Sequence, residues 1–341
     1  MTTLRPPLAP MEAQSVEQLP LGPEWQYEPK WDGFRCLVFR DGHDVYLQSK
    51  SRPLARYFPE VVQAMLAVDA PNFVLDGELV IPVDGQLSFD DLLLRLHPAE
   101  SRVRKLAGEI PATFIAFDLL ETADGEVLLD EPLFVRRDAL EAFSTNFRAG
   151  IELSPATEDV SVAQDWFRDS GGGLDGVMAK LLDAPYTAGE RIAMRKYKNL
   201  RTAECVVGGF RYGSGASKST VASLLLGLYD DEGKLHHVGF TSAMNAEMKK
   251  ALTPKLEALK SPPGFTGRAP GGPSRWSTER SAEWVPLKPT LVAEVQYDHF
   301  SGGRFRHGTG FLRWRPDKPP EACTMDQLTK PGASALTLIR R

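Results

Sequence analysis

Cysteine is scarce in this sequence: the 341 residues contain three, Cys36, Cys205 and Cys323, and no two of them form a CxxC pair. So few and so widely spaced thiols build neither a four-cysteine zinc module nor a disulfide framework, which is typical of proteins in a reducing cytosol. No apolar run approaches the ~20 residues that span a bilayer. The first residues also lack the apolar segment of a signal peptide. We therefore expect a cytoplasmic protein without membrane association.

Two further nucleotide or metal signatures are absent or incomplete. The sequence has no Rossmann glycine fingerprint and no histidine pair at metal-binding spacing. Residues 213–220 are similar to a P-loop, but no glycine directly precedes Lys218, and the residues that follow favour a strand over a helix. We interpret this stretch as a basic hairpin loop.

Charge is distributed unevenly along the chain. The net charge is −5, but residues 1–200 hold 20 Lys and Arg against 32 Asp and Glu, giving −12, whereas residues 201–341 hold 20 against 13, giving +7. This asymmetry indicates that the second half binds a polyanion. A merely solvated basic face is the alternative.

Length and patterning favour two domains. After an extended surface arm of about two dozen residues, strands alternate with helices expected over 59–67, 89–96, 100–107, 134–147 and 160–170. From about residue 201, short strands separated by Gly-rich turns dominate, with one helix over 245–259. This second texture suits a small β-barrel of the OB type.

Lys30 stands between apolar residues, with one residue separating it from a turn signal, Asp32-Gly33. Glycine accepts positive φ and aspartate tolerates it, so the chain reverses here. A lysine that is held at such a turn, partly desolvated and close to other cations, loses its proton more readily and becomes a nucleophile. The alternative is a surface lysine beside an ordinary hairpin.

Two strand-like segments carry unusual charges. Asp76 and Glu78 flank Gly77 inside the apolar run 73–81. Buried strands seldom hold two acids unless these are paired or bind a cation, so a functional site is favoured over a surface bulge. Lys196 and Lys198 alternate along another strand and therefore share one face, where an anion would offset them. A solvent-facing edge strand is the alternative there.

Taken in order, these pieces resemble the nucleotidyltransferase superfamily of ATP-dependent DNA ligases, and most closely its short bacterial LigC-type members. Lys30-Trp31-Asp32-Gly33 matches the KxDG motif of that family. The other similar segments are Ser51-Arg52, Asp76-Gly77-Glu78, Phe117-Asp118-Leu119, Asp175 to Lys180, Lys196-Tyr197-Lys198 and Arg313 to Lys318. Seven motifs in the same order, covering nearly the whole chain, are a specific signal. Asp175 and Met194 depart from the Glu and Trp of many relatives, but neither change removes a charge.

The resemblance implies an α+β fold with two domains. Residues 1–200 would form an adenylation (nucleotidyltransferase) domain, ATP-grasp-like, with antiparallel sheets and flanking helices. Residues 201–341 would form a C-terminal OB-fold β-barrel.

The resemblance also implies the chemistry. ATP would adenylate Lys30, and the AMP would pass to the 5′-phosphate of a nick before the strand is sealed. Lys196 and Lys198 would hold the α-phosphate and, together with Mg²⁺, help depress the pKa of Lys30. Glu78 and Asp175 would bind Mg²⁺ or Mn²⁺, or contact ribose. The remaining nucleotide-binding candidates are Glu28 and Phe117 for adenine, Arg35 and Arg52 for ribose and the nick phosphate, Lys180, and Arg313, Arg315 and Lys318 for pyrophosphate.

The implied partner is nicked double-stranded DNA, bound by a nucleoid-associated monomer in DNA repair, with other repair proteins as further candidate partners. An RNA ligase or a GTP-dependent mRNA-capping guanylyltransferase shares the lysine and several motifs and stays open as an alternative. An NAD⁺-dependent ligase would need a zinc module. An inactive DNA-binding scaffold has no need of Lys30, Glu78 and Lys198 together.

Overall fold

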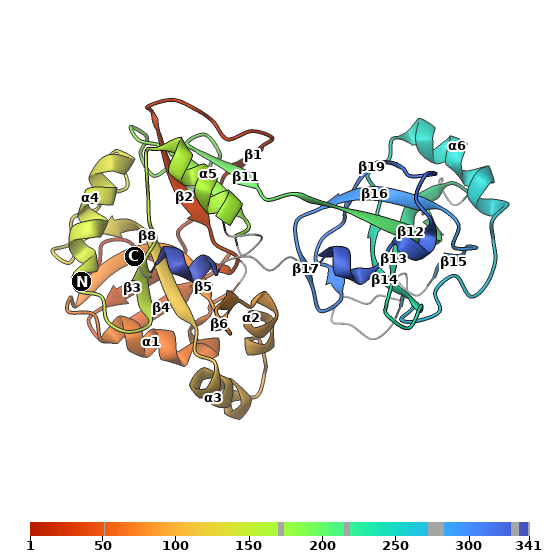
Figure 1. Ribbon diagram of the computed structural model, residues 1–341. Helices are drawn as coiled ribbons and strands as arrows, with labels where there is room; N and C mark the ends of the chain where they lie inside the picture. The colour runs from red at the N-terminus through yellow and green to blue at the C-terminus, as the bar shows by residue number, and fades with distance from the viewer. Residues whose placement is uncertain (51, 170–173, 215–218, 272–282, 329–333, 340–341) are drawn as a thin grey trace. The chain divides into compact units, whose positions relative to one another are not determined.

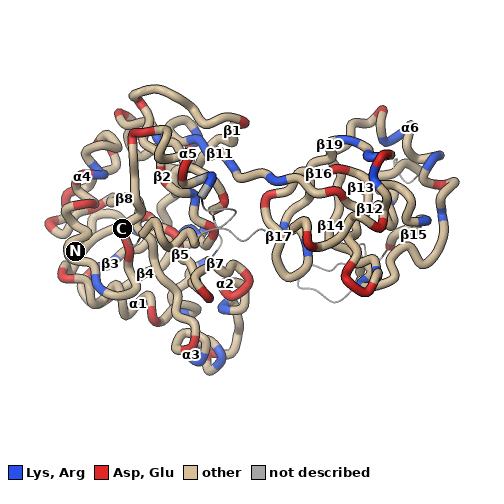
Figure 2. The backbone as a smooth tube through the Cα atoms, in the orientation of Figure 1, with Lys and Arg blue, Asp and Glu red and all other residues tan. Residues whose placement is uncertain are grey.

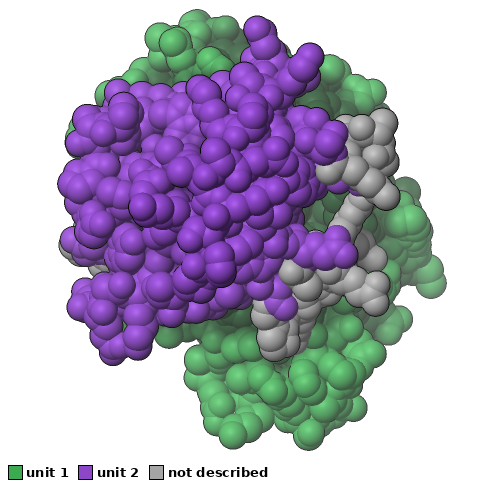
Figure 3. Space-filling model, turned by 90° about the vertical axis from the view of Figure 1, so that its right-hand side faces the viewer, with its two compact units in different colours: residues 1–199, 331–341 green, residues 200–330 purple. Residues whose placement is uncertain are grey.

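A computed structural model describes residues 1–50, 52–169, 174–214, 219–271, 283–328 and 334–339 of the chain. The chain divides into two compact units, residues 1–199 with 331–341, and residues 200–330 (Figure 3). Sequence reasoning placed everything after residue 200 in one domain. The last eleven residues instead belong to the first unit, because Ala335 and Leu336 are buried there. Ser51 and residues 215–218 of the P-loop-like stretch lie outside the described residues.

Two sheets form the centre of the first unit (Figure 1). One has the strand order β1-β11-β10-β2, and the other has the order β4-β3-β5-β8-β9. The strands of the first sheet are β1 (Gln14–Val16), β2 (Trp25–Lys30), β10 (Gly176–Leu181) and β11 (Met194–Lys198). Those of the second are β3 (Phe34–Asp41), β4 (Asp44–Gln48), β5 (Asn72–Val80), β8 (Thr113–Glu121) and β9 (Ile151–Leu153).

Glycine permits the close approach of strands beside the KxDG turn and the paired acids. A Cβ on Gly33 would collide with the carbonyl oxygen of Leu79, and one on Gly77 would collide with the ring of Phe114. Both positions therefore exclude any side chain. Gly33 lets the chain before β3 approach β5, in which Glu78 lies opposite Arg35, and Gly77 lets β5 approach β8.

The predicted helices of the first unit are confirmed. They are α1 (Pro59–Leu66), α2 (Phe89–Arg95), α3 (Glu100–Glu109), α4 (Leu133–Ser144) and α5 (Val160–Asp169), with a 3₁₀ turn η1 (Ala55–Tyr57) and a small hairpin of β6 (Pro82–Val83) and β7 (Gln86–Leu87). Pro59 begins α1 because its fixed φ suits the first helical position. Arg136 of α4 reaches back to β8, where it donates to both oxygens of Asp118 at 2.9 and 3.1 Å.

The two chain ends are bound to this unit. The N-terminal arm is extended as expected, but it is not a loose surface segment, since Met11 is 2% exposed. Its backbone at Thr3 and Leu4 donates to the carboxylate of Glu121 at 2.6 and 2.7 Å. At the other end, the 3₁₀ turn η5 (Ala335–Leu338) joins the apolar cluster that contains Trp31.

The second unit is built on one sheet with the order β14-β13-β12-β16-β19, and β15 also pairs with β12. Its elements are β12 (Arg201–Tyr212), β13 (Val221–Tyr229), β14 (Leu235–Thr241), α6 (Ala246–Glu257), β15 (Val285–Pro286), β16 (Val292–Tyr297), β17 (Phe300–Ser301), β18 (Arg304–Phe305), β19 (Gly310–Trp314), η3 (Pro320–Ala322) and η4 (Met325–Leu328). The predicted run of short strands with one helix is therefore confirmed. Asn245 caps α6 by accepting from the amide of Met248 at 2.7 Å.

The sheet of the second unit does not close into a barrel within the described residues. Its edge strands, β14 and β19, meet only near their ends, through an isolated bridge between Thr241 and Thr309. The OB-fold barrel expected from the sequence is therefore not established by the strand pairing. Among the described residues, none of the helices has the length and apolar character needed to cross a bilayer.

Candidate active site

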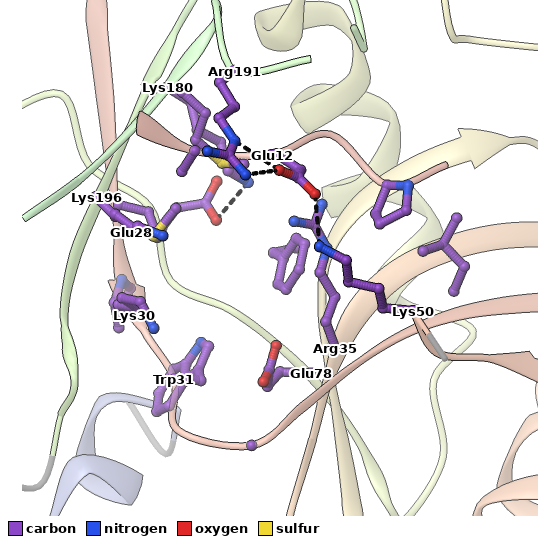
Figure 4. Close-up of a pocket in the computed structure, with 18 of the residues that line it drawn as sticks. Glu12, Glu28, Lys30, Trp31, Arg35, Lys50, Glu78, Lys180, Arg191 and Lys196 are labelled. Atoms are coloured by element: carbon purple, nitrogen blue, oxygen red, sulfur yellow. Dashed lines mark hydrogen bonds and ion pairs between the residues drawn. The ribbon is translucent and has the colours of Figure 1, made fainter. Parts of the chain in front are cut away.

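A cavity of about 430 Å³ opens in the first unit, and both of its sheets contribute to the walls (Figure 4). Seven of the residues selected from the sequence line it. They are Glu28, Lys30, Arg35, Glu78, Phe117, Lys180 and Lys196. These residues come from six different strands, so only the folded chain brings them together.

Strand register places the charged residues of the first sheet in rows. Lys30 on β2 lies opposite Gly176 on β10, which in turn lies opposite Lys198 on β11. Two residues further along, Met178 of β10 lies between Glu28 and Lys196. Since alternate residues of a strand point to one face, the amines and carboxylate of these two rows project from the same side of the sheet.

Lys30 is the most consequential of these residues. Its amine donates to the carboxylate of Asp175, and its side chain is 22% exposed, so it is neither a free surface lysine nor fully enclosed. Burial lowers the pKa of Lys30, but the charge and hydrogen bond of Asp175 outweigh that effect, and the pKa lies above its ordinary value. The expectation of a lowered pKa is therefore wrong for the protein without ligand, in which the amine is protonated.

Arg35 is fixed by the acid that precedes Gly77. Its guanidinium donates to both oxygens of Asp76 at 3.0 and 2.6 Å and to the carbonyl of Met11 at 2.6 Å. Asp76 is fully buried and also accepts from the hydroxyl of Tyr186 at 2.6 Å. Asp76 thus holds Arg35 in one orientation, and the second acid of the motif is left to face the cavity.

That second acid, Glu78, has an unusual protonation state. Burial raises its pKa to about 8, although Lys30 and Arg35 act in the opposite direction. Its carboxyl group is thus largely protonated at neutral pH when no cation other than these two is close. An additional positive charge close to such a carboxyl group strongly stabilises its ionised form.

Glu28 is nearly inaccessible. It is 1% exposed, and its two oxygens pair with the Lys180 amine and the Gln26 amide, both at 2.8 Å. The Lys180 amine also lies 4.7 Å from the centre of the Phe117 ring, and the Arg35 guanidinium lies 5.4 Å from it. Cations favour the negative face of an aromatic ring, so Phe117 joins both sheets of the cavity wall.

Lys196 is the lysine of the wall that has no ion pair or hydrogen bond at its amine among the described residues. Burial lowers its pKa, and the neighbouring charges of Lys30 and Lys198 lower it further. Three amines gathered on one sheet therefore create a strong positive potential, which is suited to an anionic ligand.

Six of the predicted residues do not line this cavity. Asp175 and Lys198 lie beside it in the first unit, since Asp175 pairs with Lys30 and Lys198 stands in the same row of the sheet. Arg52 is exposed in the turn after β4. Arg313, Arg315 and Lys318 belong to the second unit and are paired with acids there: Arg313 with Glu294 at 2.6 Å, Arg315 with Asp317 at 2.7 Å, and Lys318 with Glu204 at 2.7 Å. These three side chains would have to exchange their partners to bind a ligand.

Sequence reasoning missed three charged residues of the wall, Glu12, Lys50 and Arg191. Glu12 belongs to the N-terminal arm and Arg191 to the loop before β11, and neither has a periodic or motif-like surrounding. Lys50 follows β4 in a turn. No sequence pattern predicts that these three residues contact one another.

The donor set is compatible with Mg²⁺ shared with a nucleotide. Glu78 and Asp175 supply hard oxygen ligands, and no group of three or more His, Cys, Asp or Glu suited to a metal occurs in the described part of the chain. Mg²⁺ commonly binds through one or two carboxylates, with water and substrate phosphates completing its octahedron. Glu78 and Asp175 fit this pattern, and they do not fit a closed all-protein metal cage.

A cationic cavity between two sheets, with the lysine of the KxDG motif on its wall, is the arrangement expected of a covalent nucleotidyltransferase. The family model of the ATP dependent DNA ligase domain matches residues 7–198, and that of the ATP dependent DNA ligase C terminal region matches residues 217–318. The chain belongs to the ATP-dependent DNA ligases, as its motifs predicted, and it is of the short bacterial LigC type.

Two mycobacterial relatives match this chain along nearly their whole length. The chain is 46% identical to DNA ligase C2 of Mycolicibacterium smegmatis over 97% of its own length and 96% of that protein. It is 44% identical to DNA ligase C of Mycobacterium tuberculosis, with the same coverage. A solved Lig E DNA ligase, 17% identical, superposes with a TM-score of 0.57 over 90% of this chain and 99% of the other, which supports the fold alone.

Proposed function

We propose that this ligase seals nicks in duplex DNA through a lysyl-AMP intermediate formed on Lys30. The observation that supports this proposal is the position of the Lys30 amine, which is partly buried, paired with Asp175 and on the wall of a cationic cavity. The nicked-DNA substrate follows from membership of the family.

The first step is a nucleotidyl transfer, in which AMP moves from ATP to Lys30. The Nζ atom of Lys30 forms a bond to the α-phosphorus of ATP, the bond from that phosphorus to the bridging oxygen breaks, and pyrophosphate leaves. The amine must lose a proton beforehand, and this requires that the charge of Asp175 be offset. AMP then passes to the 5′-phosphate at the nick, and the 3′-hydroxyl displaces it. Such transfers depend mainly on positioning and charge neutralisation.

The remaining residues divide into cations and acids with separate tasks. Lys196 and Lys198 would hold the α-phosphate, and Arg35, fixed by Asp76, would contact ribose. Glu78 and Asp175 would bind Mg²⁺, which supplies positive charge against the phosphates and against the carboxylate that raises the pKa of Lys30. Phe117 would stack on adenine while sharing its ring with Lys180, and Glu28 would give up one of its partners to accept from the adenine amino group.

We assign DNA binding to the second unit, as an OB-type domain. Residues 200–330 hold 18 Lys and Arg against 13 Asp and Glu, a net charge of +5, while the first unit is acidic. Figure 2 shows the basic residues of this unit on β19, on α6 and along the start of β12. Arg52, Arg313, Arg315 and Lys318 would contact the nick or the leaving pyrophosphate. Affinity for nicked DNA should therefore fall steeply with salt, through counterion release.

Label transfer tests the proposal. The wild-type chain should acquire ³²P from α-labelled ATP, and Lys30→Ala should acquire none, because no other amine occupies that position. Lys105→Ala is the matched control, since Lys105 lies on α3 at the surface. A Lys30→Ala protein that still becomes labelled would overturn the proposal.

The same reaction separates the alternative functions. Labelling from GTP in place of ATP would favour a capping guanylyltransferase. Sealing of nicked RNA without sealing of nicked DNA would favour an RNA ligase. We expect ATP labelling and sealed DNA.

A further inference from the structure

Glu12 joins two cations across the mouth of the cavity (Figure 4). One carboxylate oxygen accepts from the Lys50 amine at 3.0 Å, and the other accepts from the Arg191 guanidinium at 2.6 and 2.7 Å. Lys50 follows β4, and Arg191 precedes β11, so these two cations belong to different sheets of the unit. A single carboxylate thus pairs with the two most exposed cations of the wall and offsets one of their two charges.

The arm that carries Glu12 is held independently of these ion pairs. The amide of Glu12 donates to the carbonyl of Glu190 at 2.8 Å, and the carbonyl of Pro10 accepts from Gly189 at 3.2 Å. Gln48 adds two hydrogen bonds to the backbone of Leu8, at 2.6 and 3.0 Å. The Glu12 side chain can therefore leave its partners while the backbone of the arm stays in place.

This pairing differs from that of the deeper cations. Lys180 and Arg35 pair with acids that are almost completely buried, Glu28 and Asp76. In the outer group the carboxylate of Glu12 is 28% exposed, and its partners Lys50 and Arg191 are 81% and 66% exposed. Exposed ion pairs contribute little and exchange readily with other ions, whereas breaking a buried pair is costly.

The carboxylate is charged under all ordinary conditions. Hydrogen bonds from Arg191 and Lys50, followed by their charges, lower the pKa of Glu12 to about 2. An anion with two oxygens held between an arginine and a lysine is the same arrangement that these side chains offer to a phosphate group.

We propose that Glu12 stands in for a phosphate group of the substrate and occupies Lys50 and Arg191 until that phosphate displaces it. Glu12 is then a specificity-determining residue: it lowers the affinity of the site for any weakly bound anion, so that only a ligand held by further contacts displaces it. The inference rests on the proposed function, because the displacing phosphate is that of ATP or of the nicked strand.

The decisive comparison is between Glu12→Gln and Glu17→Gln. Both substitutions remove one negative charge from the N-terminal segment, but Glu17 is exposed and lies five residues after Glu12. The proteins are first treated with pyrophosphate, which returns any bound AMP to ATP. Binding is then measured calorimetrically with α,β-methylene-ATP, whose bridging carbon blocks AMP transfer, and with adenosine, which carries no phosphate.

If the triphosphate displaces Glu12, Glu12→Gln should bind α,β-methylene-ATP about threefold to tenfold more tightly than Glu17→Gln does, and adenosine equally well. The difference should shrink at high salt, because the charges involved are exposed. If the nick phosphate displaces Glu12, the gain should instead appear on nicked duplex with a 5′-phosphate and not on the same duplex with a 5′-hydroxyl.

Two results would overturn the inference. Equal affinities of Glu12→Gln and Glu17→Gln for every phosphate-bearing ligand would show that nothing displaces the carboxylate. Weaker binding of adenosine to Glu12→Gln would show that Glu12 contacts the base. Wild-type labelling by ATP, measured in parallel, separates these outcomes from a failure of the proposed function, which would leave even the wild-type chain unlabelled.

Discussion

Lys30 and Asp175 form an ion pair that joins the last residue of β2 to the residue preceding β10, and the backbone amide of Asp175 also donates to the carbonyl of Lys30 at 3.1 Å. The two residues are 145 positions apart in the sequence. Because Asp175 raises the pKa of Lys30, the partner that orients the amine also keeps it protonated.

Replacing Asp175 should therefore move the pH dependence of adenylation. Asp175→Asn removes the charge that raises the pKa of Lys30, while burial continues to lower it, so the deprotonated amine should become available at lower pH. We expect the pH of half-maximal single-turnover adenylation, measured at saturating Mg²⁺, to fall by about one unit or more. The maximal rate will also drop if Asp175 binds the metal, so the midpoint is the readout. An unchanged or higher midpoint would contradict the conclusion that Asp175 raises the pKa of Lys30.

Glu78 should make the free protein less stable as the pH rises. Its pKa of about 8 in the folded chain lies above the ordinary value of 4.5, so between these values the folded state binds more protons than the unfolded state does. The contribution of Glu78 to the unfolding free energy is then fully present below about pH 4.5 and is lost as the pH rises through 8. The unfolding free energy falls with a slope of up to about 1.4 kcal/mol per pH unit.

Glu78→Gln cannot ionise and should lose that slope. In urea unfolding without ATP or Mg²⁺, we expect the unfolding free energy of Glu78→Gln to rise relative to that of the wild type as the pH increases from 6 to 9. The unfolding free energy of Glu17→Gln should not rise in this way. A constant difference between Glu78→Gln and wild type across this range would rule out the raised pKa.

Asp118 should prove structural although it belongs to a family motif. Its side chain is 2% exposed and pairs with both nitrogens of the Arg136 fork, which is 1% exposed. Asp118→Asn leaves a buried charge without its partner and should cost about 3 kcal/mol of unfolding free energy. The control is Asp69→Asn, which removes an exposed pair with Arg148 and should cost almost nothing. An Asp118→Asn protein as stable as the wild type would contradict this prediction.

The second unit should be sensitive to acid because of His237. Its side chain is 8% exposed and packs against Phe265, and burial, with the charges of Arg211 and Arg304, lowers its pKa to about 3. Below about pH 6.5 the unfolded chain takes up a proton that the folded chain refuses, so stability falls as pH falls toward 3.

His237→Phe should remove this loss. As the pH falls from 7 to 5, we expect the unfolding free energy of His237→Phe to rise by about 2 kcal/mol relative to that of the wild type, measured by urea unfolding. His43→Phe, in the exposed turn between β3 and β4, should gain nothing. If His237→Phe and wild type respond alike to acid, the imidazole is not buried as a neutral group.

The motifs located the site because each is a short local pattern. Lys30, Glu78, Phe117, Lys180 and Lys196 were all selected from the sequence, and all line the cavity. The apolar runs around them fixed strands whose residues alternate between faces, and the helical periodicities gave the positions of α1 to α6. What a residue does within its own strand or turn follows from its neighbours in the sequence.

Long-range pairing could not be predicted in this way. Nothing near Asp175 in the sequence indicates that it reverses the expected pKa shift of Lys30, and nothing near Glu12 indicates a clasp on Lys50 and Arg191. Likewise Asp118 and Glu78 look equivalent as acids within apolar strands, yet one neutralises a buried arginine and the other faces the cavity.

The sequence by itself determined the family, the lysine of its KxDG motif and the order of strands and helices, because these depend on residues close together along the chain. Only the tertiary structure decided the protonation of Lys30 and Glu78, the return of the C-terminal residues to the first unit and the partial neutralisation of the cavity mouth. Each of these depends on the distance between charges or apolar groups that lie far apart in the sequence, and folding alone sets that distance.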